Sequence, residues 1–355
     1  MNIRFLKPFC ATVVAALLSF ALPASAKDDY RIAWSIYVGW MPWGYAADAG
    51  IVDKWAAKYG ITIEVVQINE YVPSITQYTA GAFDGCTMTN MDALTIPAAG
   101  GVDSTALIVG DFSNGNDGIL LKGAGATLAD IKGQKVNLVE LSVSHYTLAR
   151  ALDSIGLTER DVRVENTSDA DIVAAFTTDH VTSAVTWNPL LSEILAMPNV
   201  TNVFDSSRIP GEIIDMLVVN TETLAADPRL GKALVGAWYE TMSIMSDAGD
   251  VGDEAKTLMA TASGTDLAGY NAQLAATRMF YKAQPAVKFV RSDDVVTTMK
   301  NIAAFSFKHG LLGDGAPNSE FIGIAYPGGK VFGSTDNVKL RFDDTYMSMA
   351  ADGEL

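Results

Sequence analysis

Cysteine and basic residues are both scarce in this chain of 355 residues. It has 2 cysteines, and Cys10 lies in an N-terminal segment that reads as cleavable, so Cys86 would remain alone and form no intramolecular disulfide. Asp and Glu outnumber Lys and Arg by 41 to 25, which gives a formal net charge of −16. Nucleic acid and anionic membrane surfaces are therefore poor partners for this chain.

The spacing motifs of common catalytic and metal sites are also missing. The sequence has no Walker loop, no GxGxxG and no GxSxG. Its histidines, His145, His180 and His309, are far apart and match no zinc-binding spacing. The segment 111–117 is rich in Asp and Asn but lacks Gly and Glu where a calcium loop needs them, and we expect a hinge turn there. We therefore expect no metal, no cofactor and no enzymatic activity.

The N-terminus has the three parts of a secretory signal peptide. Arg4 and Lys7 precede an apolar run at 11–20, and an A-x-A cleavage signal ends at Ala26. The run is too short to span a membrane, and no other stretch approaches about 18 apolar residues. We expect cleavage after Ala26. Because Lys27 rather than a cysteine follows, we expect no lipid anchor and place the mature protein in the periplasm of a Gram-negative cell.

Short β-branched strands alternate with amphipathic helical patterns along the rest of the chain, which predicts an α/β fold. The first group has strands at 30–34, 61–67, 85–88 and 105–109 and helices at 44–59, 72–80 and 92–99. The second has strands at 118–122, 135–139, 162–165 and 183–186 and helices at 146–155 and 169–177. A strand at 216–220 returns to the first group, and helices at 231–246, 254–262, 267–276 and 293–307 wrap it. We predict two α/β lobes joined by two crossovers: 27–117 with 214–355, and 118–213, after the signal peptide 1–26.

Several phrases of the sequence resemble those of one family. They include Gly81-Ala-Phe-Asp84-Gly, Leu128-Ala-Asp-Ile-Lys132-Gly and Ala184-Val-Thr-Trp187-Asn188-Pro189. They are similar to phrases of the type II periplasmic binding proteins of ABC importers, in the branch that serves nitrate, sulfonate, taurine and thiamin precursors. The runs 32–45 and 87–94 resemble more narrowly the subgroup encoded beside urea carboxylase-type enzymes of urea and guanidine breakdown. The resemblance implies an ABC permease in the inner membrane as partner.

Aromatic residues and acids dominate the loops in which the resemblance places the solute. Three of the six tryptophans fall between residues 34 and 43, and no Lys or Arg occurs between Lys58 and Lys122. The expected pocket loops contain no Lys or Arg; they are 34–45, 84–117, 139–149 and 183–207. Aromatic faces and carboxylates attract a small organic cation, whereas an anion needs Arg, Lys or a helix N-terminus. We therefore expect a small guanidine- or urea-like solute, guanidinium first. Taurine or another sulfonate, nitrate and bicarbonate are the alternatives, and an enzyme resembling thiamin-pyrimidine synthases is a more remote one.

Ten residues are candidates for contact with the solute. They are Trp34, Tyr37, Trp43, Asn90, Asp92, Glu140, Ser142, His145, Trp187 and Asp215. Asp215 matches, by the resemblance, the position at which taurine-binding relatives hold an ammonium group. Structural roles are the alternatives for several of the others: core packing for the tryptophans, helix capping for Asp92 and Ser142, and solvated surface for Glu140 and His145. Trp40 is expected in the core.

Overall fold

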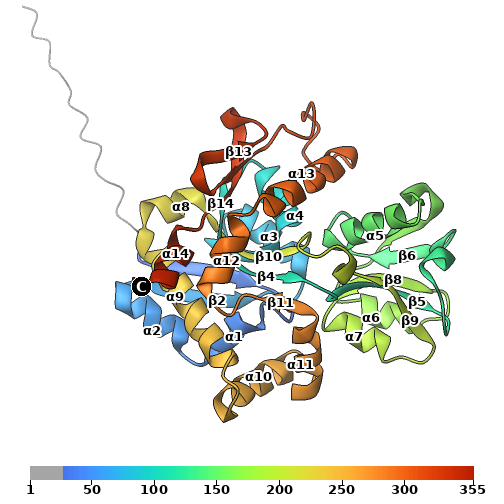
Figure 1. The fold of residues 1–355 in the computed structure, drawn as a ribbon, viewed down its shortest axis with the longest axis horizontal. Helices are drawn as coiled ribbons and strands as arrows, with labels where there is room; N and C mark the ends of the chain where they lie inside the picture. The colour runs from blue at the N-terminus through green and yellow to red at the C-terminus, as the bar shows by residue number, and fades with distance from the viewer. Residues whose placement is uncertain (1–26) are drawn as a thin grey trace, which may run out of the picture.

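The computed structural model describes residues 27–355, so the expected signal peptide and its cleavage site after Ala26 lie outside the described residues. Two β-sheets, each packed with helices, divide these residues into two lobes (Figure 1). The larger sheet has nine strands in the order β13-β12-β14-β4-β10-β3-β1-β2, with β11 paired to β4. The smaller has five in the order β7-β6-β8-β5-β9.

The larger sheet is built from both ends of the described chain. Its strands are β1 (Asp29–Trp34), β2 (Thr62–Gln67), β3 (Gly85–Thr89), β4 (Ser104–Ser113), β10 (Ile214–Asn220), β11 (Thr277–Met279), β12 (Gly323–Tyr326), β13 (Lys330–Phe332) and β14 (Val338–Phe342). β1 pairs in parallel with β2 and β3, as the βαβ pattern predicts. β10 is the returning strand and runs antiparallel between β3 and β4.

Helices surround this sheet. They are α1 (Met41–Asp48), α2 (Ile51–Tyr59), α3 (Tyr71–Thr79), α4 (Asn90–Ala93), α8 (Thr221–Ala226), α9 (Pro228–Met245), α10 (Asp250–Ala262), α11 (Leu267–Ala275), α12 (Ala283–Val290), α13 (Asp293–Lys308) and α14 (Thr345–Asp352). The single helix predicted over 44–59 is wrong, because Gly50 takes a left-handed conformation (φ 69°) that ends α1 and starts α2. The helix predicted over 92–99 starts at Asn90 and becomes a π-helix at Leu94–Ala98, which contains Pro97.

The smaller sheet mixes parallel and antiparallel pairs. Its strands are β5 (Asp117–Lys122), β6 (Lys135–Leu138), β7 (Arg163–Asn166), β8 (Ser183–Trp187) and β9 (Val200–Asp205), and its helices are α5 (Val143–Ser154), α6 (Ile172–Phe176) and α7 (Leu190–Leu195). β6 lies parallel to β7 and β8, whereas β5 is antiparallel to both β8 and β9. The sequence did not predict β9.

The two crossovers between the lobes lie side by side. β4 runs on to Ser113 and β5 starts at Asp117, so the expected hinge turn at 111–117 is reduced to the short link between these strands. The hydroxyl of Ser206, on the returning crossover, lies 2.6 Å from that of Ser113 and accepts the backbone N–H of Gly115 at 2.8 Å. Within residues 27–355, no helix combines the length and apolar character that a membrane span requires.

Candidate functional site

A small cavity lies between the lobes, close to the crossovers. Its cavity volume is about 10 Å³, and it is lined by Tyr37, Trp40, Tyr71, Thr89, Asp117, Val143, Trp187 and Asp215. The larger lobe supplies the loop after β1, the start of α3, the end of β3 and the start of β10. The smaller lobe supplies the start of β5, the first residue of α5 and the end of β8. A solute in this cavity would contact both lobes.

Four aromatic rings form a continuous wall around the cavity. Tyr37 and Trp40 have ring centroids 5.0 Å apart, Trp40 and Tyr71 5.6 Å, and Tyr71 and Trp187 5.6 Å. Trp187 reaches across from the smaller lobe, and its indole N–H donates to the carbonyl of Ile36 at 3.4 Å. These rings offer π-faces to a planar or cationic group.

Two aspartates, Asp117 and Asp215, line the cavity, and a third, Asp111, lies beside Asp215. Asp111 on β4 and Asp215 on β10 are direct register partners, so their side chains lie on the same face of the sheet. The hydroxyl of Tyr37 donates to Asp111 Oδ1 at 3.0 Å. Asp117 starts β5, so it comes from the first crossover. The exposed fractions of Asp111, Asp215 and Asp117 are 0, 3 and 4%.

These aspartates have no basic partner among the described residues, where every recorded ion pair involves other acids. Burial raises the pKa of Asp111 to about 7 and that of Asp117 to about 7. Burial and then repulsion from Asp111 and Asp117 raise the pKa of Asp215 well above its usual range. A cation in the cavity would stabilise the ionised form of all three groups.

Asp92 lies just behind the cavity wall. Its Oδ2 accepts the hydroxyls of Tyr71 at 2.7 Å and Thr89 at 2.8 Å, whereas its Oδ1 is buried without a hydrogen-bond partner. Burial raises the pKa of Asp92 to about 6 despite these donors. Asp92 therefore positions Tyr71 and Thr89 and does not itself line the cavity.

Three candidates from the first lobe lie outside the cavity. Trp34 lines a different pocket with Gly44 and Tyr45, at the outer side of α1. Trp43 is buried and stacks on Trp238 of α9 with ring centroids 5.2 Å apart, because α1 starts at Met41 and its turn directs Trp43 into the core. The amide of Asn90 donates to the carbonyl of Glu212 at 3.1 Å and accepts the N–H of Ile214 at 3.1 Å, so it holds the returning crossover.

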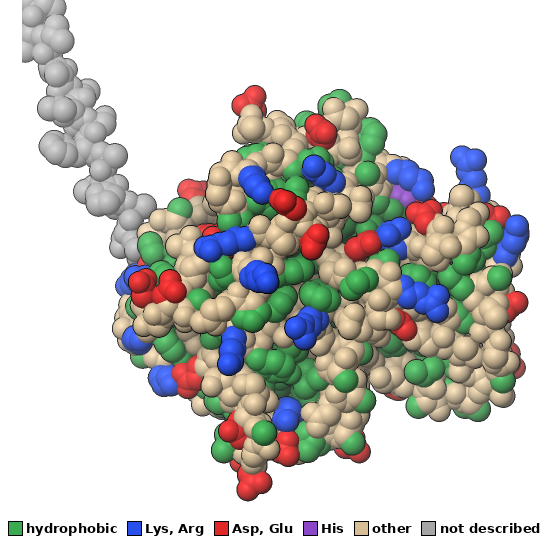
Figure 2. Space-filling model, in the orientation of Figure 1, with side chains coloured by type: hydrophobic (Ala, Val, Ile, Leu, Met, Phe, Trp, Pro, Cys, Tyr) green, Lys and Arg blue, Asp and Glu red, His purple; other side chains and the backbone are tan. Residues whose placement is uncertain are grey.

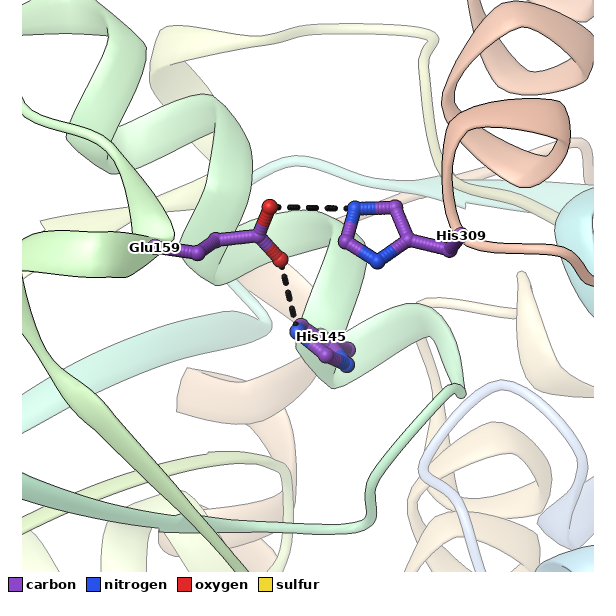
Figure 3. Close-up of side chains that lie close together, drawn as sticks. All are labelled: His145, Glu159 and His309. Carbon is purple, nitrogen blue, oxygen red and sulfur yellow. Dashed lines mark ion pairs between the residues drawn. The ribbon is translucent and has the colours of Figure 1, made fainter.

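Three candidates from the second lobe also lie outside it. Glu140 is exposed, and the hydroxyl of Ser142 caps α5 by accepting the N–H of Ser144 at 3.2 Å. His145, expected as a solute contact or a surface residue, is buried at a lobe interface instead. It joins Glu159 of the same lobe and His309, which follows α13 of the other lobe (Figure 3). The sequence separates these residues too widely for the cluster to be foreseen.

The His145–Glu159–His309 cluster has the side chains of a metal site but the wrong hydrogen bonding for one. Nε2 of His145 is 2.8 Å and Nε2 of His309 3.0 Å from the Glu159 carboxylate. Nδ1 of His145 accepts the backbone N–H of Leu141 at 3.2 Å. In a neutral ring the hydrogen is therefore on Nε2, the nitrogen that a metal would need. The cluster is better explained as a polar contact between the lobes.

Sequence reasoning missed several residues that line the cavity. Trp40, expected in the core, is part of the aromatic wall. Asp117 lines the cavity and Asp111 lies beside Asp215; both were recognised as acids without nearby cations but were assigned to a hinge turn. Tyr71 and Val143 each stand at the start of a helix and carry no sequence signal that separates them from other helix-starting residues.

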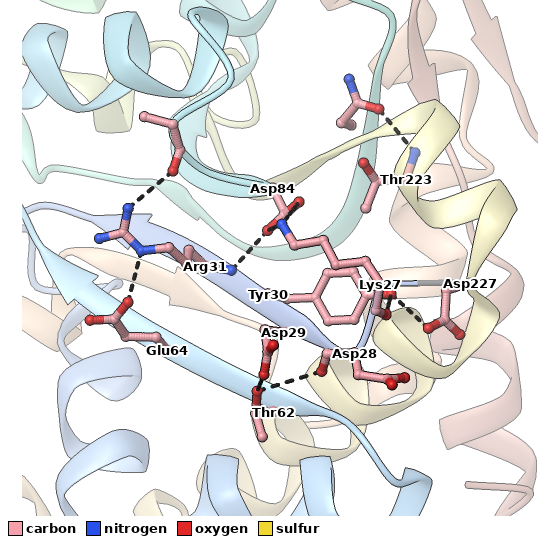
Figure 4. Close-up of polar contacts among 12 residues, drawn as sticks. Lys27, Asp28, Asp29, Tyr30, Arg31, Thr62, Glu64, Asp84, Thr223 and Asp227 are labelled. Atoms are coloured by element: carbon pink, nitrogen blue, oxygen red, sulfur yellow. Dashed lines mark hydrogen bonds and ion pairs between the residues drawn. The ribbon is translucent and has the colours of Figure 1, made fainter. Parts of the chain in front are cut away.

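Acids outside the cavity have the basic partners that the cavity acids lack. On the visible face of the molecule, positive and negative side chains are interspersed (Figure 2). Beside β1, Lys27 contacts Asp84 at 2.8 Å and Arg31 contacts Glu64 at 2.7 Å (Figure 4). Asp84 also accepts the backbone N–H of Arg31 at 2.8 Å. These basic side chains thus pair with acids at the surface of the protein.

Comparison with known proteins identifies the fold. No protein-family model matches the sequence. A protein of Brucella abortus (strain 2308), provisionally named a binding protein, is 29% identical over 151 residues, which are 42% of this chain and 46% of that relative, so less than half of the relative is matched. The alkanesulfonate-binding protein SsuA from Xanthomonas axonopodis pv. citri, bound to MOPS, has a TM-score of 0.67 at 17% identity, covering 82% of this chain and 96% of that one. The periplasmic nitrate-binding protein NrtA from Synechocystis PCC 6803 has a TM-score of 0.63 at 13% identity, covering 92% and 89%.

The chain has the periplasmic binding protein fold. The architecture predicted from the sequence, two α/β lobes joined by two crossovers, is confirmed. At these identities the likeness concerns the fold. A shared fold does not fix a ligand, so only the residues of the cavity bear on what it could bind.

Proposed function

We propose that this protein is the solute-binding component of an ABC importer, that it is exported to the periplasm, and that it delivers a small guanidine-like cation to an inner-membrane permease. The fold and the cavity between its lobes support this proposal. A solute that contacts both lobes stabilises their closed arrangement, which a permease can distinguish from the open one.

The observation that carries the proposal is the set of buried aspartates without basic partners. An uncompensated buried charge is costly, and a cation beside Asp111, Asp117 and Asp215 would remove that cost. Nitrate, bicarbonate or a sulfonate would instead bring a further negative charge to the same place. The cavity therefore favours a cation over the anions named for the solved relatives.

The lining favours an organic cation over a metal ion. Tyr37, Trp40 and Trp187 surround the acids with aromatic carbon rather than with metal-ligating oxygen. In residues 27–355, the one group with metal-ligand spacing is the His145–Glu159–His309 cluster, away from this lining. Guanidinium is planar, can stack on an indole, and donates paired hydrogen bonds to a carboxylate. Neutral urea has a similar shape but cannot compensate the charge.

Calorimetry tests this proposal directly. The protein would be unfolded and refolded to remove carried-over solute, then titrated with guanidinium chloride, methylguanidinium chloride, urea, taurine and nitrate. We expect guanidinium to bind most tightly of these. Tight binding of taurine or nitrate with none of guanidinium would overturn the proposal.

Replacement of Asp215 tests whether binding depends on the charge of the solute or only on its shape. We expect Asp215→Asn to weaken guanidinium binding by about 10- to 100-fold, because a hydrogen bond to a charged group is lost, and to change urea binding much less. Glu140→Gln, at an exposed position outside the cavity, is the control and should leave both affinities unchanged. Equal losses for guanidinium and urea would count against a carboxylate-driven site.

We expect binding without turnover. Cys86, the sole cysteine of residues 27–355, is buried, and burial raises its thiol pKa to about 12, so it is a poor nucleophile. An enzyme of the thiamin-pyrimidine-synthase type would consume its solute. Recovery of unchanged guanidinium after prolonged incubation with the protein is the expected result.

A further inference from the structure

The acidic cavity contains a pair of carboxyl groups that cannot both be ionised without strong repulsion. Asp111 and Asp215 are direct register partners on β4 and β10, so their side chains lie on the same face of the sheet, and both are buried. Two ionised carboxylates this close in a buried site repel each other strongly, which favours a proton on one of them. Asp111 Oδ2 and Asp215 Oδ2 have no hydrogen-bond partner in the described protein.

The groups that face this pair offer no alternative positive charge. They are the acid Asp117 on β5 and the tyrosines Tyr37 after β1, Tyr270 on α11 and Tyr281 after β11. Burial raises the pKa of Tyr37 and of Tyr270 well above the usual range, so these tyrosines remain neutral. Arg278 on β11 is exposed and forms no ion pair with an acid of the described chain.

We propose that the cavity binds its cation in exchange for a proton. The Asp111–Asp215 pair holds one proton while no cation is bound, and the entering cation sends that proton to the solvent. The O–H bond of one carboxyl breaks, its electron pair stays on the oxygen, and the charged oxygen then accepts a hydrogen bond from the cation. The net charge of the buried site stays the same, which avoids the cost of changing it.

The separation of the two carboxyl groups does not depend on whether the lobes are open or closed. Both carboxyl groups stand on neighbouring strands of the larger sheet, so lobe opening leaves their mutual distance unchanged. Asp117, at the crossover, adds like charge and favours retention of the proton. This inference rests on the proposed function, because it requires that the solute be a cation.

Calorimetry in two buffers tests the exchange. Guanidinium chloride would be titrated at about pH 7 in phosphate and in Tris, whose ionisation enthalpies differ widely. We expect the difference in binding heat to correspond to release of about one proton in the wild type and in Glu140→Gln, and to none in Asp215→Asn. We also expect the wild-type affinity to fall about tenfold per pH unit once the solution is more acidic than the pKa of the pair.

The outcomes separate this inference from the proposed function. Binding with equal heats in the two buffers and an affinity independent of pH would overturn the exchange and leave the cation-binding function intact. Absence of guanidinium binding in both buffers would overturn the proposed function and the exchange with it. Infrared spectroscopy gives a readout without solute: at about pH 7 the band of protonated carboxyl groups should be weaker in Asp215→Asn than in the wild type, and equal bands in the two proteins would also overturn the exchange.

Discussion

At the level of single residues, the hydrogen-bonding and ionic partners of an aspartate determine its role in this protein. The pKa of Asp227 is lowered, even though burial acts to raise it, because Arg229 and Tyr30 donate to its carboxylate. Asp111 and Asp215 have no such cation, and burial raises their pKa values instead. The first arrangement stabilises the fold, whereas the second leaves the carboxyl groups available to a solute.

Trp187 and Trp43 were both predicted as solute contacts, but their replacement by alanine should affect different quantities: solute binding for Trp187 and stability for Trp43. We expect Trp187→Ala to weaken guanidinium binding by about 2- to 30-fold, since a cation–π contact contributes roughly 0.5 to 2 kcal/mol. We expect Trp43→Ala, in the core against Trp238, to lower the free energy of unfolding by about 3 to 5 kcal/mol.

Calorimetry of binding and of thermal unfolding measures these two effects. Guanidinium chloride is unsuitable as denaturant here, because it is also the expected solute. A strongly destabilised Trp187→Ala that binds normally would show that Trp187 is a core residue only.

The sequence predicts the chemistry of the site better than it predicts which residues line the cavity. The absence of basic residues from 59–121 is a property of composition and needs no coordinates. Whether Trp40 or Trp43 faces the cavity depends on the residue at which α1 starts, and a shift of one residue turns a helical side chain by about 100°. Trp40 precedes the helix and lines the cavity, whereas Trp43 lies inside it and packs in the core.

At the level of elements, strands with clear hydrophobic patterns were predicted and irregular elements were not. β1, β2, β3 and β10 fall within two residues of their expected bounds. The parallel pairing of β1 with its neighbours follows from the alternation of strands and helices. The strands β12 and β13 are short and contain glycine or lie exposed, so their local pattern is too weak to predict them.

The junction between α4 and the returning crossover depends on one side chain. We expect Asn90→Ala to lower the free energy of unfolding by about 1 to 3 kcal/mol, because its loss leaves the buried N–H of Ile214 and the carbonyl of Glu212 without their partner. Thermal unfolding measures the loss, and Asn114→Ala, at an exposed position on the other crossover, is the control. An Asn90→Ala protein as stable as this control would contradict the assigned role.

At the level of the whole molecule, polar contacts between the lobes hold the cavity closed. The indole N–H of Trp187 donates to the carbonyl of Ile36, and the backbone N–H of Tyr71 donates to Asp169 at 3.0 Å. The His145–Glu159–His309 cluster adds a further contact farther from the cavity. Because these contacts surround the cavity, occupation of the cavity and closure of the lobes should stabilise each other.

The raised pKa values of the cavity acids also predict how stability depends on pH. A carboxyl whose folded pKa is raised binds its proton more tightly in the folded state, so it stabilises the fold at low pH and loses that contribution as pH rises through the folded pKa. The pKa is about 6 for Asp92 and about 7 for Asp111 and Asp117, against an ordinary value of 3.8. We therefore expect the melting temperature of the solute-free protein to fall between about pH 5 and pH 8.

Two variants and added guanidinium should each change this pH dependence of the melting temperature in a defined direction. The pKa of His309 is lowered, chiefly by burial, so its contribution has the opposite sign and is lost as pH falls through the unfolded value of 6.5. His309→Gln should therefore steepen the fall in melting temperature with rising pH, whereas Asp215→Asn should flatten it. Guanidinium at low millimolar concentration should raise the melting temperature more at pH 8 than at pH 5, because it replaces the proton that the cavity loses. A melting temperature that rises from pH 5 to pH 8 without solute would mean that the cavity acids are ionised in the folded protein and that no proton remains to be exchanged.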